Sequence, residues 1–153
     1  MTTPLVSVLM TAYNREKYIA EAMESVLASS FQDFELIVVD DRSRDRTVEI
    51  ARSFDRDPRV KIHVNAENLG DYANRNRAAE LARGKYLKYV DSDDRIYPHG
   101  LEVMVKSMEA FPEAGCGLSR PNALDRPYPV QLSPEEAYRE QFFGRGLFEN
   151  APL

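Results

Sequence analysis

Short runs of apolar, mostly β-branched residues recur along the first two thirds of the chain, separated by longer stretches of helical period. The runs that predict strands are Val6–Met10, Leu36–Val39, Val60–Val64 and Tyr86–Val90, with a weaker one at Gly115–Ser119. The first two runs are apolar at nearly every position, which is typical of strands buried on both faces. We therefore expect a sheet that is covered by helices on both sides.

Five segments between and after these runs predict helices. Ile19, Ala22, Met23, Val26 and Leu27 recur at the spacing of a helix face that packs on a core. Further helices are expected from Ser43 or Asp45 to about Phe54, from about Asp71 to Arg83, from near Pro98 to before Pro112, and from Pro134 to about Phe143.

Two of these helices carry specific end signals. Gly84 is expected to supply the left-handed residue that ends the third helix. Ser133, Pro134 and Glu136 place an N-cap, a first-turn proline and a capping-box acid in the positions where a helix begins. The last helix therefore has the clearest predicted start.

The order of these elements predicts the fold class. Strands joined by helices of ten or more residues pair in parallel through right-handed crossovers. Residues 1–119 are therefore expected to form an α/β fold, an open, mostly parallel Rossmann-like sheet with helices on both faces. Residues 120–153 begin with a proline-rich stretch and are expected to hold a loop followed by one helix.

Composition excludes several classes of protein. The chain has 153 residues and a net charge of −5, which argues against a basic groove for nucleic acid. A single cysteine, Cys116, excludes a disulfide scaffold and is typical of a reducing compartment. The N-terminus lacks the pattern of a secretory signal, and no apolar run approaches the ~18 residues of a membrane span. We therefore expect a cytoplasmic domain.

Acidic residues follow two of the predicted strands. Asp40 and Asp41 come directly after the second strand, and Asp91, Asp93 and Asp94 come after the fourth. Because ligands bind open α/β sheets at the carboxyl ends of the strands, these five aspartates predict a site on one rim. Crowded carboxylates need a positive partner, and their hard oxygen ligands suit Mg²⁺ or Mn²⁺. We therefore expect a divalent cation there.

Plainer interpretations remain open for some of these residues. Asp40 and Asp41 are equally well explained by a turn that precedes a helix cap. The three carboxylates of Asp91–Asp94 exceed what a cap requires, so a functional interpretation is favoured there. His63 and His99 do not cluster, and a structural role is favoured for both.

Other residues near the predicted rim are basic, and several known site motifs are missing. Arg75 is equally consistent with a phosphate contact and a solvated helix face, whereas a solvated face is favoured for Arg42, Arg44 and Arg77. The chain has no dinucleotide-binding glycine fingerprint, P-loop or nucleophile elbow. Receiver domains and dehalogenase-type phosphatases need acidic residues after the first strand, where Thr11-Ala12-Tyr13 stand instead.

Four ordered blocks of sequence carry a family resemblance. The blocks are Val6–Asn14, Ser25–Asp45, Asn68–Gly70 with Arg75-Asn76, and Gly84–Asp94, which ends in Val-Asp-Ser-Asp-Asp. In this order and spacing they resemble the family 2 glycosyltransferases, closely from residue 4 to about residue 112 and loosely beyond. The resemblance implies the A-type glycosyltransferase fold and inverting transfer from a nucleotide-diphosphate sugar, with a UDP-sugar favoured.

The resemblance also implies roles for individual residues of the donor site. Contacts to the nucleobase fall to Thr11, Tyr13 and Asp41, with the tyrosine ring stacked on the base. Asn68 and Arg75 help to hold the base or the phosphates. Asp91 binds the ribose. Asp93 ligates Mg²⁺ or Mn²⁺, with Asp91 and Asp94 as further possible ligands.

The acceptor side is expected to be incomplete. The resemblance implies an acceptor sugar or lipid-linked glycan in cell-envelope polysaccharide or lipopolysaccharide synthesis, with the enzyme cytoplasmic or peripheral to the inner membrane face. It also implies a general base in a part that follows the matched region, so we expect that base beyond Leu153. Glu135, Glu136 and Glu149 lie in no matching motif. The alternative is a nucleotide-sugar-binding module or inactive fragment without catalysis.

Overall fold

The structure of the protein is a computed structural model that describes residues 3–117 and 131–142. The chain divides into two compact units, residues 1–102 and residues 103–153. Each unit is described by itself, and the first contains the whole sheet. The expected division at residues 119 and 120 stays a prediction.

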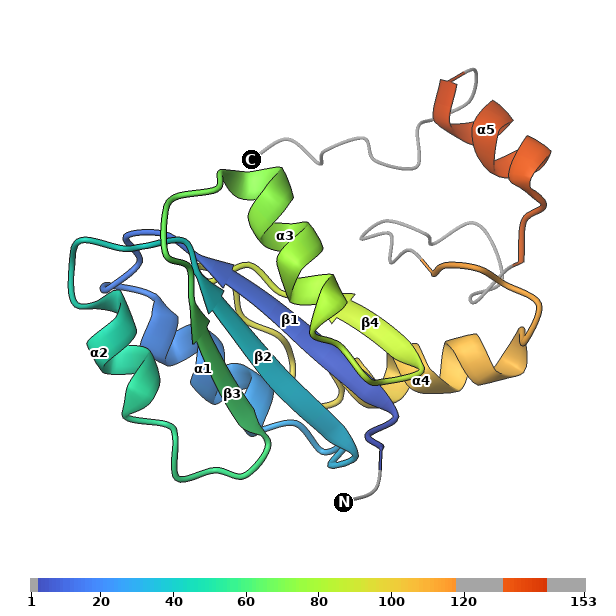
Figure 1. The fold of residues 1–153 in the computed structure, drawn as a ribbon. Helices are drawn as coiled ribbons and strands as arrows, with labels where there is room; N and C mark the ends of the chain where they lie inside the picture. Colours follow the sequence, from blue (N-terminus) through green and yellow to red (C-terminus); the bar gives the residue numbers. More distant parts are fainter. Residues whose placement is uncertain (1–2, 118–130, 143–153) are drawn as a thin grey trace. The chain divides into compact units, whose positions relative to one another are not determined.

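A four-stranded parallel sheet forms the centre of the first unit (Figure 1). Its strands are β1 (Val6–Ala12), β2 (Phe34–Asp40), β3 (Val60–Val64) and β4 (Tyr86–Tyr89), in the spatial order β3-β2-β1-β4. All four were expected from the apolar runs. Residues 115–117 of the expected fifth strand are not in a strand, and the rest of it lies outside the described residues.

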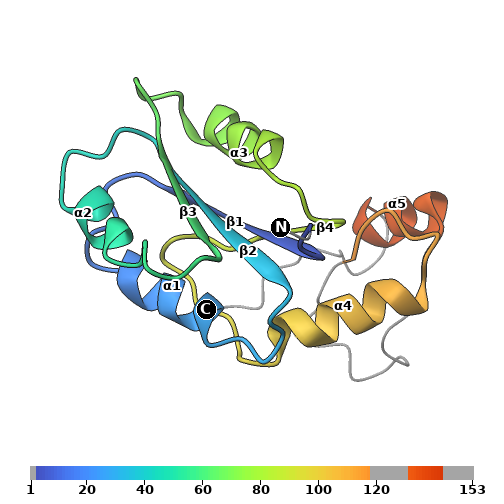
Figure 2. The same cartoon turned by 60° about the horizontal axis from the view of Figure 1, so that its bottom comes forward.

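Helices cover both faces of the sheet, as expected (Figure 2). Helix α3 (Asp71–Glu80) lies on one face, and α1 (Ile19–Leu27) and α2 (Thr47–Arg52) lie on the other. The remaining helices are α4 (Gly100–Ala110), which crosses the boundary between the units, and α5 (Pro134–Phe142) in the second unit. Among the described residues, no helix combines the length and apolar character needed to cross a membrane.

The apolar runs are buried because both faces of the central strands pack against helices. Leu9, Ile37 and Val39 are fully buried and form one cluster with Ala78 of α3. Ile19, Met23 and Val26 of α1 are also fully buried. Every residue of β2 is buried, including Glu35 and Asp40, which flank the apolar run Leu36–Val39 that predicted the strand. This packing fixes the strand ends that carry the polar residues.

Helix α2 is shorter than expected. It begins at Thr47, and its N-cap residue is Arg46, not Ser43 or Asp45 as expected. Asp45 lies one residue before the N-cap, and its Oδ1 accepts the Thr47 N–H. The helix ends at Arg52, and the Phe54 N–H then donates to Ala51 O in a tighter turn. The apolar residues that suggested a longer helix therefore continue into this turn.

The prediction for Gly84 is wrong. Its φ is not positive, and α3 ends at Glu80 without a left-handed residue. Glycine is needed at this position for space, because a Cβ there would lie 2.5 Å from the backbone nitrogen of Ser7. Among the glycines in the described ranges, the left-handed one is Gly70, with φ 84°, at the start of α3.

The start of α5 matches its prediction in detail. The Ser133 N–H donates to Glu136 Oε2 over 2.8 Å, and the Glu136 N–H donates to Ser133 Oγ over 3.3 Å. This reciprocal pair is a capping box, and it engages Glu136. Glu135 pairs with Arg139 one turn later, over 2.9 Å. Both acids therefore have structural partners.

Candidate functional site

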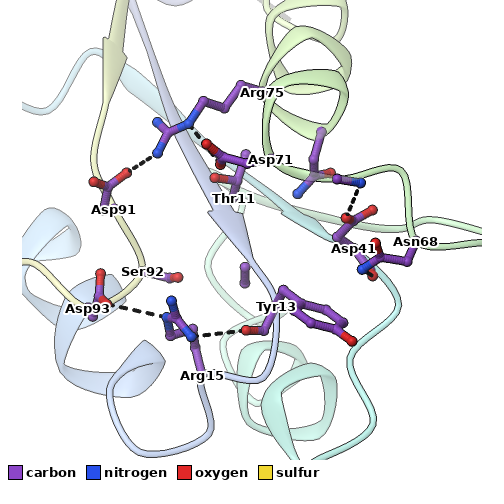
Figure 3. A pocket seen from close by; sticks show the side chains of 13 residues that line it. Thr11, Tyr13, Arg15, Asp41, Asn68, Asp71, Arg75, Asp91, Ser92 and Asp93 are labelled. Atoms are coloured by element: carbon purple, nitrogen blue, oxygen red, sulfur yellow. Dashed lines mark hydrogen bonds and ion pairs between the residues drawn. The ribbon is translucent and has the colours of Figure 1, made fainter.

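A cleft of about 480 Å³ opens at the carboxyl ends of β1, β2 and β4 (Figure 3). Its walls come from the end of β1 and the loop after it, from the residue after β2, from the start of α3, and from the loop after β4. The lining residues are Thr11, Ala12, Tyr13, Arg15, Asp41, Asn68, Gly70, Asp71, Asn74, Arg75, Asp91, Ser92 and Asp93. The volume lies in the range of small-molecule sites.

Asp41 is held rigidly at one end of the cleft. Its Oδ1 accepts the Leu69 N–H over 2.8 Å, and its Oδ2 accepts the Gly70 N–H over 2.8 Å. Asn65 Nδ2 donates a third bond to Oδ1, also over 2.8 Å. The positive φ of Gly70 turns the chain so that two successive N–H groups converge on the carboxylate. Asp41 is 3% exposed, so its remaining accepting capacity is presented in one fixed direction.

A buried amide network supports this carboxylate from behind. Asn65 Nδ2 also donates to Asn74 Oδ1 over 2.9 Å, and Asn74 Nδ2 donates to Val39 O over 3.1 Å. Asn68 Nδ2 donates to the backbone carbonyl of Asp41 over 3.0 Å. These bonds connect β2, the loop after β3 and α3, so the orientation of Asp41 depends on all three.

The loops after β1 and β2 are bonded to each other. The Asn14 N–H donates to Ser43 Oγ over 2.8 Å, and the Arg44 N–H donates to Asn14 Oδ1 over 2.9 Å. The Arg15 N–H donates to Thr47 Oγ1 over 2.7 Å. Asn14 has φ 54°, a conformation that costs free energy and is held here by these bonds. The interlocked loops hold Tyr13, which is 40% exposed, at the wall of the cleft.

Arg75 and Asp91 form an ion pair across the cleft, between α3 and the loop after β4. Arg75 Nη2 lies 2.8 Å from Asp91 Oδ1, and Arg75 Nε lies 3.0 Å from Asp71 Oδ1. The guanidinium also lies over the ring of Tyr89, 5.7 Å from its centre. The hydrogen bond to Asp91 is the main reason that the pKa of Arg75 is raised above its ordinary value. Arg75 is therefore held at several points.

Arg15, in the loop after β1, pairs with Asp93, which lies two residues after Asp91 in the loop after β4. Arg15 Nε lies 3.3 Å from Asp93 Oδ2, and its Nη1 donates to the Tyr13 carbonyl over 3.1 Å. Sequence reasoning missed Arg15, although it directly follows Tyr13-Asn14 after the first strand. The expected positive partner among the carboxylates is thus supplied here by two arginine side chains.

The cleft brings together most of the residues that the sequence singled out. Thr11, Tyr13, Asn68 and Arg75 line it, as do the carboxylates of Asp41, Asp91 and Asp93. Their individual roles stay predictions.

Two of the five aspartates do not join this set. Asp40 accepts hydrogen bonds from the N–H and hydroxyl of Ser43, so the turn interpretation holds for Asp40 but not for Asp41. Asp94 does not line the cleft. His63, His99, Arg42, Arg44 and Arg77 also lie outside the lining. The rim therefore gathers three of the expected carboxylates and adds Asp71.

The donor set fits a cation that is shared with a substrate. Within residues 3–117 and 131–142 no group of three or more His, Cys, Asp or Glu side chains could enclose a metal ion. Mg²⁺ commonly binds through one or two carboxylates together with substrate phosphates and water. Asp91 and Asp93 are two half-exposed carboxylates of this cleft, and each is paired with one arginine.

Comparisons with known sequences agree with this architecture. The family model described as glycosyl transferase family 2 matches residues 7–151. An uncharacterized glycosyltransferase of Haemophilus influenzae is 40% identical over 109 residues, which are 71% of this chain and 44% of that protein. TuaG of Bacillus subtilis, a glycosyltransferase assigned provisionally to teichuronic acid biosynthesis, is 38% identical over 117 residues, 76% of this chain and 45% of TuaG. The chain thus spans less than half the length of these relatives.

Solved structures show the same fold. S. aureus TarS 1-349 in complex with UDP matches with a TM-score of 0.67 and 30% identity, covering 75% of this chain and 38% of that one. The mannosyltransferase PcManGT from Pyrobaculum calidifontis, in complex with GDP-Man and Mn²⁺, matches in fold with a TM-score of 0.64 at 24% identity, covering 71% of this chain and 33% of that one. The sheet is therefore that of an A-type glycosyltransferase. Since the family model matches nearly the whole chain, the protein belongs to glycosyl transferase family 2.

Proposed function

We propose that the cleft binds a nucleotide-diphosphate sugar, with a UDP-sugar favoured, together with Mg²⁺ or Mn²⁺. In the whole enzyme it would be the donor site for inverting transfer to an acceptor hydroxyl. One observation carries the proposal: a carboxylate with three N–H donors lies beside an exposed tyrosine on one wall, and two half-exposed carboxylates paired with arginines lie on the other (Figure 3). The crystal structures of TarS with UDP and with UDP-GlcNAc support the choice of donor.

The nucleobase is assigned to the Asp41 wall. Three N–H donors already fix the Asp41 carboxylate, so its remaining lone pair can accept one further N–H from a base. The half-exposed ring of Tyr13 offers a stacking surface beside it, with Thr11 and Asn68 on the same lining. This arrangement favours a base with an N–H on its edge, as in uracil or guanine.

The diphosphate and the cation are assigned to the Asp91 and Asp93 wall. Four aspartates and two arginines line the cleft, which gives the lining a net charge of −2. A polyanionic diphosphate would be repelled by that charge unless it arrives with a cation. When bound, the cation would neutralise the charge that develops on the departing diphosphate. Asp93 would hold it, Asp91 would bind the ribose, and Arg75 would position Asp91.

The acceptor and the general base are proposed to lie in parts of the enzyme outside the described residues. Within those residues, each aspartate of the cleft already has a partner: N–H donors for Asp41 and arginines for Asp71, Asp91 and Asp93. Glu135 and Glu136 are likewise engaged at the start of α5. TuaG suggests a cell-envelope polysaccharide as the acceptor.

The same observation favours a second candidate, a nucleotide-sugar-binding module without transfer activity. The two candidates share every donor contact and differ only in the base that takes the acceptor proton. Because the general base is proposed to lie outside the described residues, a transfer assay on the whole enzyme, set beside calorimetry with UDP and Mn²⁺, separates them. Binding without turnover there would favour the module, and robust transfer would exclude it.

The donor site itself is tested by thermal shift with UDP and GDP, each with and without Mn²⁺. We expect one nucleotide to raise the melting temperature in a Mn²⁺-dependent manner, because a ligand that binds only the folded state stabilises it. Asp93→Ala should abolish the Mn²⁺-dependent part. Asp55→Ala, an exposed aspartate outside the cleft, is the matched control and should respond as the wild type does. No shift with either nucleotide would contradict the proposal.

A further inference from the structure

Arg15 lies between the two walls of the cleft that the proposed function assigns to base and cation. Figure 3 shows its guanidinium between Asp93 and Tyr13. One nitrogen, Nε, lies 3.3 Å from Asp93 Oδ2, and Nη1 donates to the carbonyls of Tyr13 and Asn14 over 3.1 and 3.4 Å. A nucleoside diphosphate that extends from Tyr13 to Asp93 would have to pass this side chain.

The two cleft arginines are held very differently. Arg75 is fixed by two carboxylates, by the ring of Tyr89 and by burial that leaves 32% of its side chain exposed. Arg15 has one carboxylate partner, at a longer distance, and 42% of its side chain is exposed. Its backbone is nevertheless anchored, because the Arg15 N–H donates to Thr47 Oγ1. Arg15 can therefore change its partner without a change in the loop that carries it.

We propose that Arg15 is a diphosphate-binding residue that Asp93 holds in the absence of ligand. When Asp93 turns to a divalent cation, the guanidinium is released and donates to the phosphates that the same cation accompanies. One side chain would thus compete with the cation for Asp93 and cooperate with it in binding the nucleotide. This inference rests on the proposed function, but it can fail while that function stands.

The energies of the two pairings support this exchange. A half-exposed ion pair contributes little net stability, so losing it changes an affinity by only about two- to fivefold. A charge-assisted hydrogen bond from a guanidinium to a phosphate is stronger, and its loss typically weakens binding by about ten- to a hundredfold. Arg15 therefore loses little by leaving Asp93 and gains more on the diphosphate.

The test is the Arg15→Gln variant, measured with two probes. Titration of Mn²⁺ alone, followed by the electron paramagnetic resonance signal of the free ion, should show binding about two- to fivefold tighter than in the wild type. Calorimetry with UDP and saturating Mn²⁺ should show binding about ten- to a hundredfold weaker. Arg15→Lys should recover part of the UDP affinity, since it keeps the charge but not the planar fork.

Opposite responses to the two probes distinguish this role from a structural one. A damaged cleft would weaken the binding of both Mn²⁺ and UDP, and that result would overturn the inference. Unchanged UDP binding would overturn it as well. Arg46→Gln is the matched control, because Arg46 forms an exposed ion pair with Glu49 outside the cleft. Equal melting temperatures would show that all variants fold. A wild type that binds neither UDP nor GDP would instead remove the proposed function itself.

Discussion

The sheet carries carboxylates paired with basic side chains at both of its ends, and the two groups differ in burial and in the number of their partners. At the amino end, Glu35 is 3% exposed and accepts hydrogen bonds from Ser7 Oγ over 2.7 Å and Lys61 Nζ over 2.6 Å. The backbone and guanidinium of Arg83 donate to it as well, over 3.0 and 2.9 Å. This carboxylate has its partners from the protein alone, and it joins β1, β2, β3 and the loop after α3.

At the carboxyl end of the sheet, Asp91 and Asp93 in the loop after β4 are only partly engaged, whereas Asp41 accepts three hydrogen bonds. Asp91 and Asp93 are nearly half exposed, and each is paired with one arginine. Pairs of this kind exchange partners at little cost, whereas a buried carboxylate cannot lose a partner without a large penalty. The comparison shows that the Glu35 cluster differs from the Asp91 and Asp93 pairs in burial and in the number of partners, not in residue type. Variants at the two ends should therefore affect different measurements.

The largest effect on stability is expected for Glu35→Ala. Removing this carboxylate leaves Lys61, Arg83 and the Ser7 hydroxyl without their common acceptor, and breaking a buried ion pair typically costs about 3–5 kcal/mol. Urea unfolding monitored by circular dichroism would measure the loss. Glu49→Ala removes an exposed partner of Arg46 and should leave the free energy of unfolding nearly unchanged. Equal losses of unfolding free energy in the two variants would refute the distinction between buried and exposed ion pairs.

Acid should weaken the hydrogen bonds and ion pairs around Glu35, because this carboxylate becomes protonated. Burial alone would raise the pKa of Glu35, but hydrogen bonds from Lys61, Ser7 and Arg83 outweigh it and lower the pKa from 4.5 to about 2. The stabilisation is therefore fully present above pH 4.5 and is lost as the pH falls toward 2, by about 3 kcal/mol in total. The difference in unfolding free energy between the wild type and Glu35→Gln should shrink over that interval. A constant difference between pH 6 and pH 2 would contradict the assignment.

A somewhat smaller loss is expected for Gly84→Ala. The new Cβ would lie 2.5 Å from Ser7 N and 2.7 Å from the Val6 carbonyl carbon, so backbone must move where Gly84 packs on β1. Overpacking of this kind typically costs about 1–3 kcal/mol. Gly115→Ala, where nothing lies within 4 Å, is the matched control and should leave the melting temperature nearly unchanged. An unaltered melting temperature for Gly84→Ala would show that the contact relaxes freely.

Much of the fold could be predicted because it depends on local pattern. The apolar runs located all four strands of the sheet, and the helical spacing located α1. Gly84 was misjudged because its need for space arises from Ser7, 77 residues earlier in the chain. Long-range contacts of this kind leave no mark in the local sequence.

The position of the cleft could be predicted from the sequence, but the hydrogen bonds and ion pairs between its side chains could not. Parallel strands must gather their carboxyl ends at one edge, so Asp41, Asp91 and Asp93 were correctly expected on one rim. Asp40 differs from Asp41 because its carboxylate turns to Ser43, and adjacent residues at a strand end point in opposite directions. Arg15 and the amides of Asn65 and Asn74 were missed, since their partners come from other elements.

The smallest effect on stability is expected for Asp91→Asn, in the cleft at the carboxyl end of the sheet. The ion pair between Asp91 and Arg75 is half exposed, and Arg75 keeps its contacts with Asp71 and the ring of Tyr89. The free energy of unfolding should therefore fall by less than about 1 kcal/mol relative to the wild type. The thermal shift caused by UDP with Mn²⁺ should nevertheless fall sharply, because the proposed ribose contact loses its charge. A stability loss above 2 kcal/mol with an intact UDP shift would reverse the assignment and make Asp91 a structural residue like Glu35.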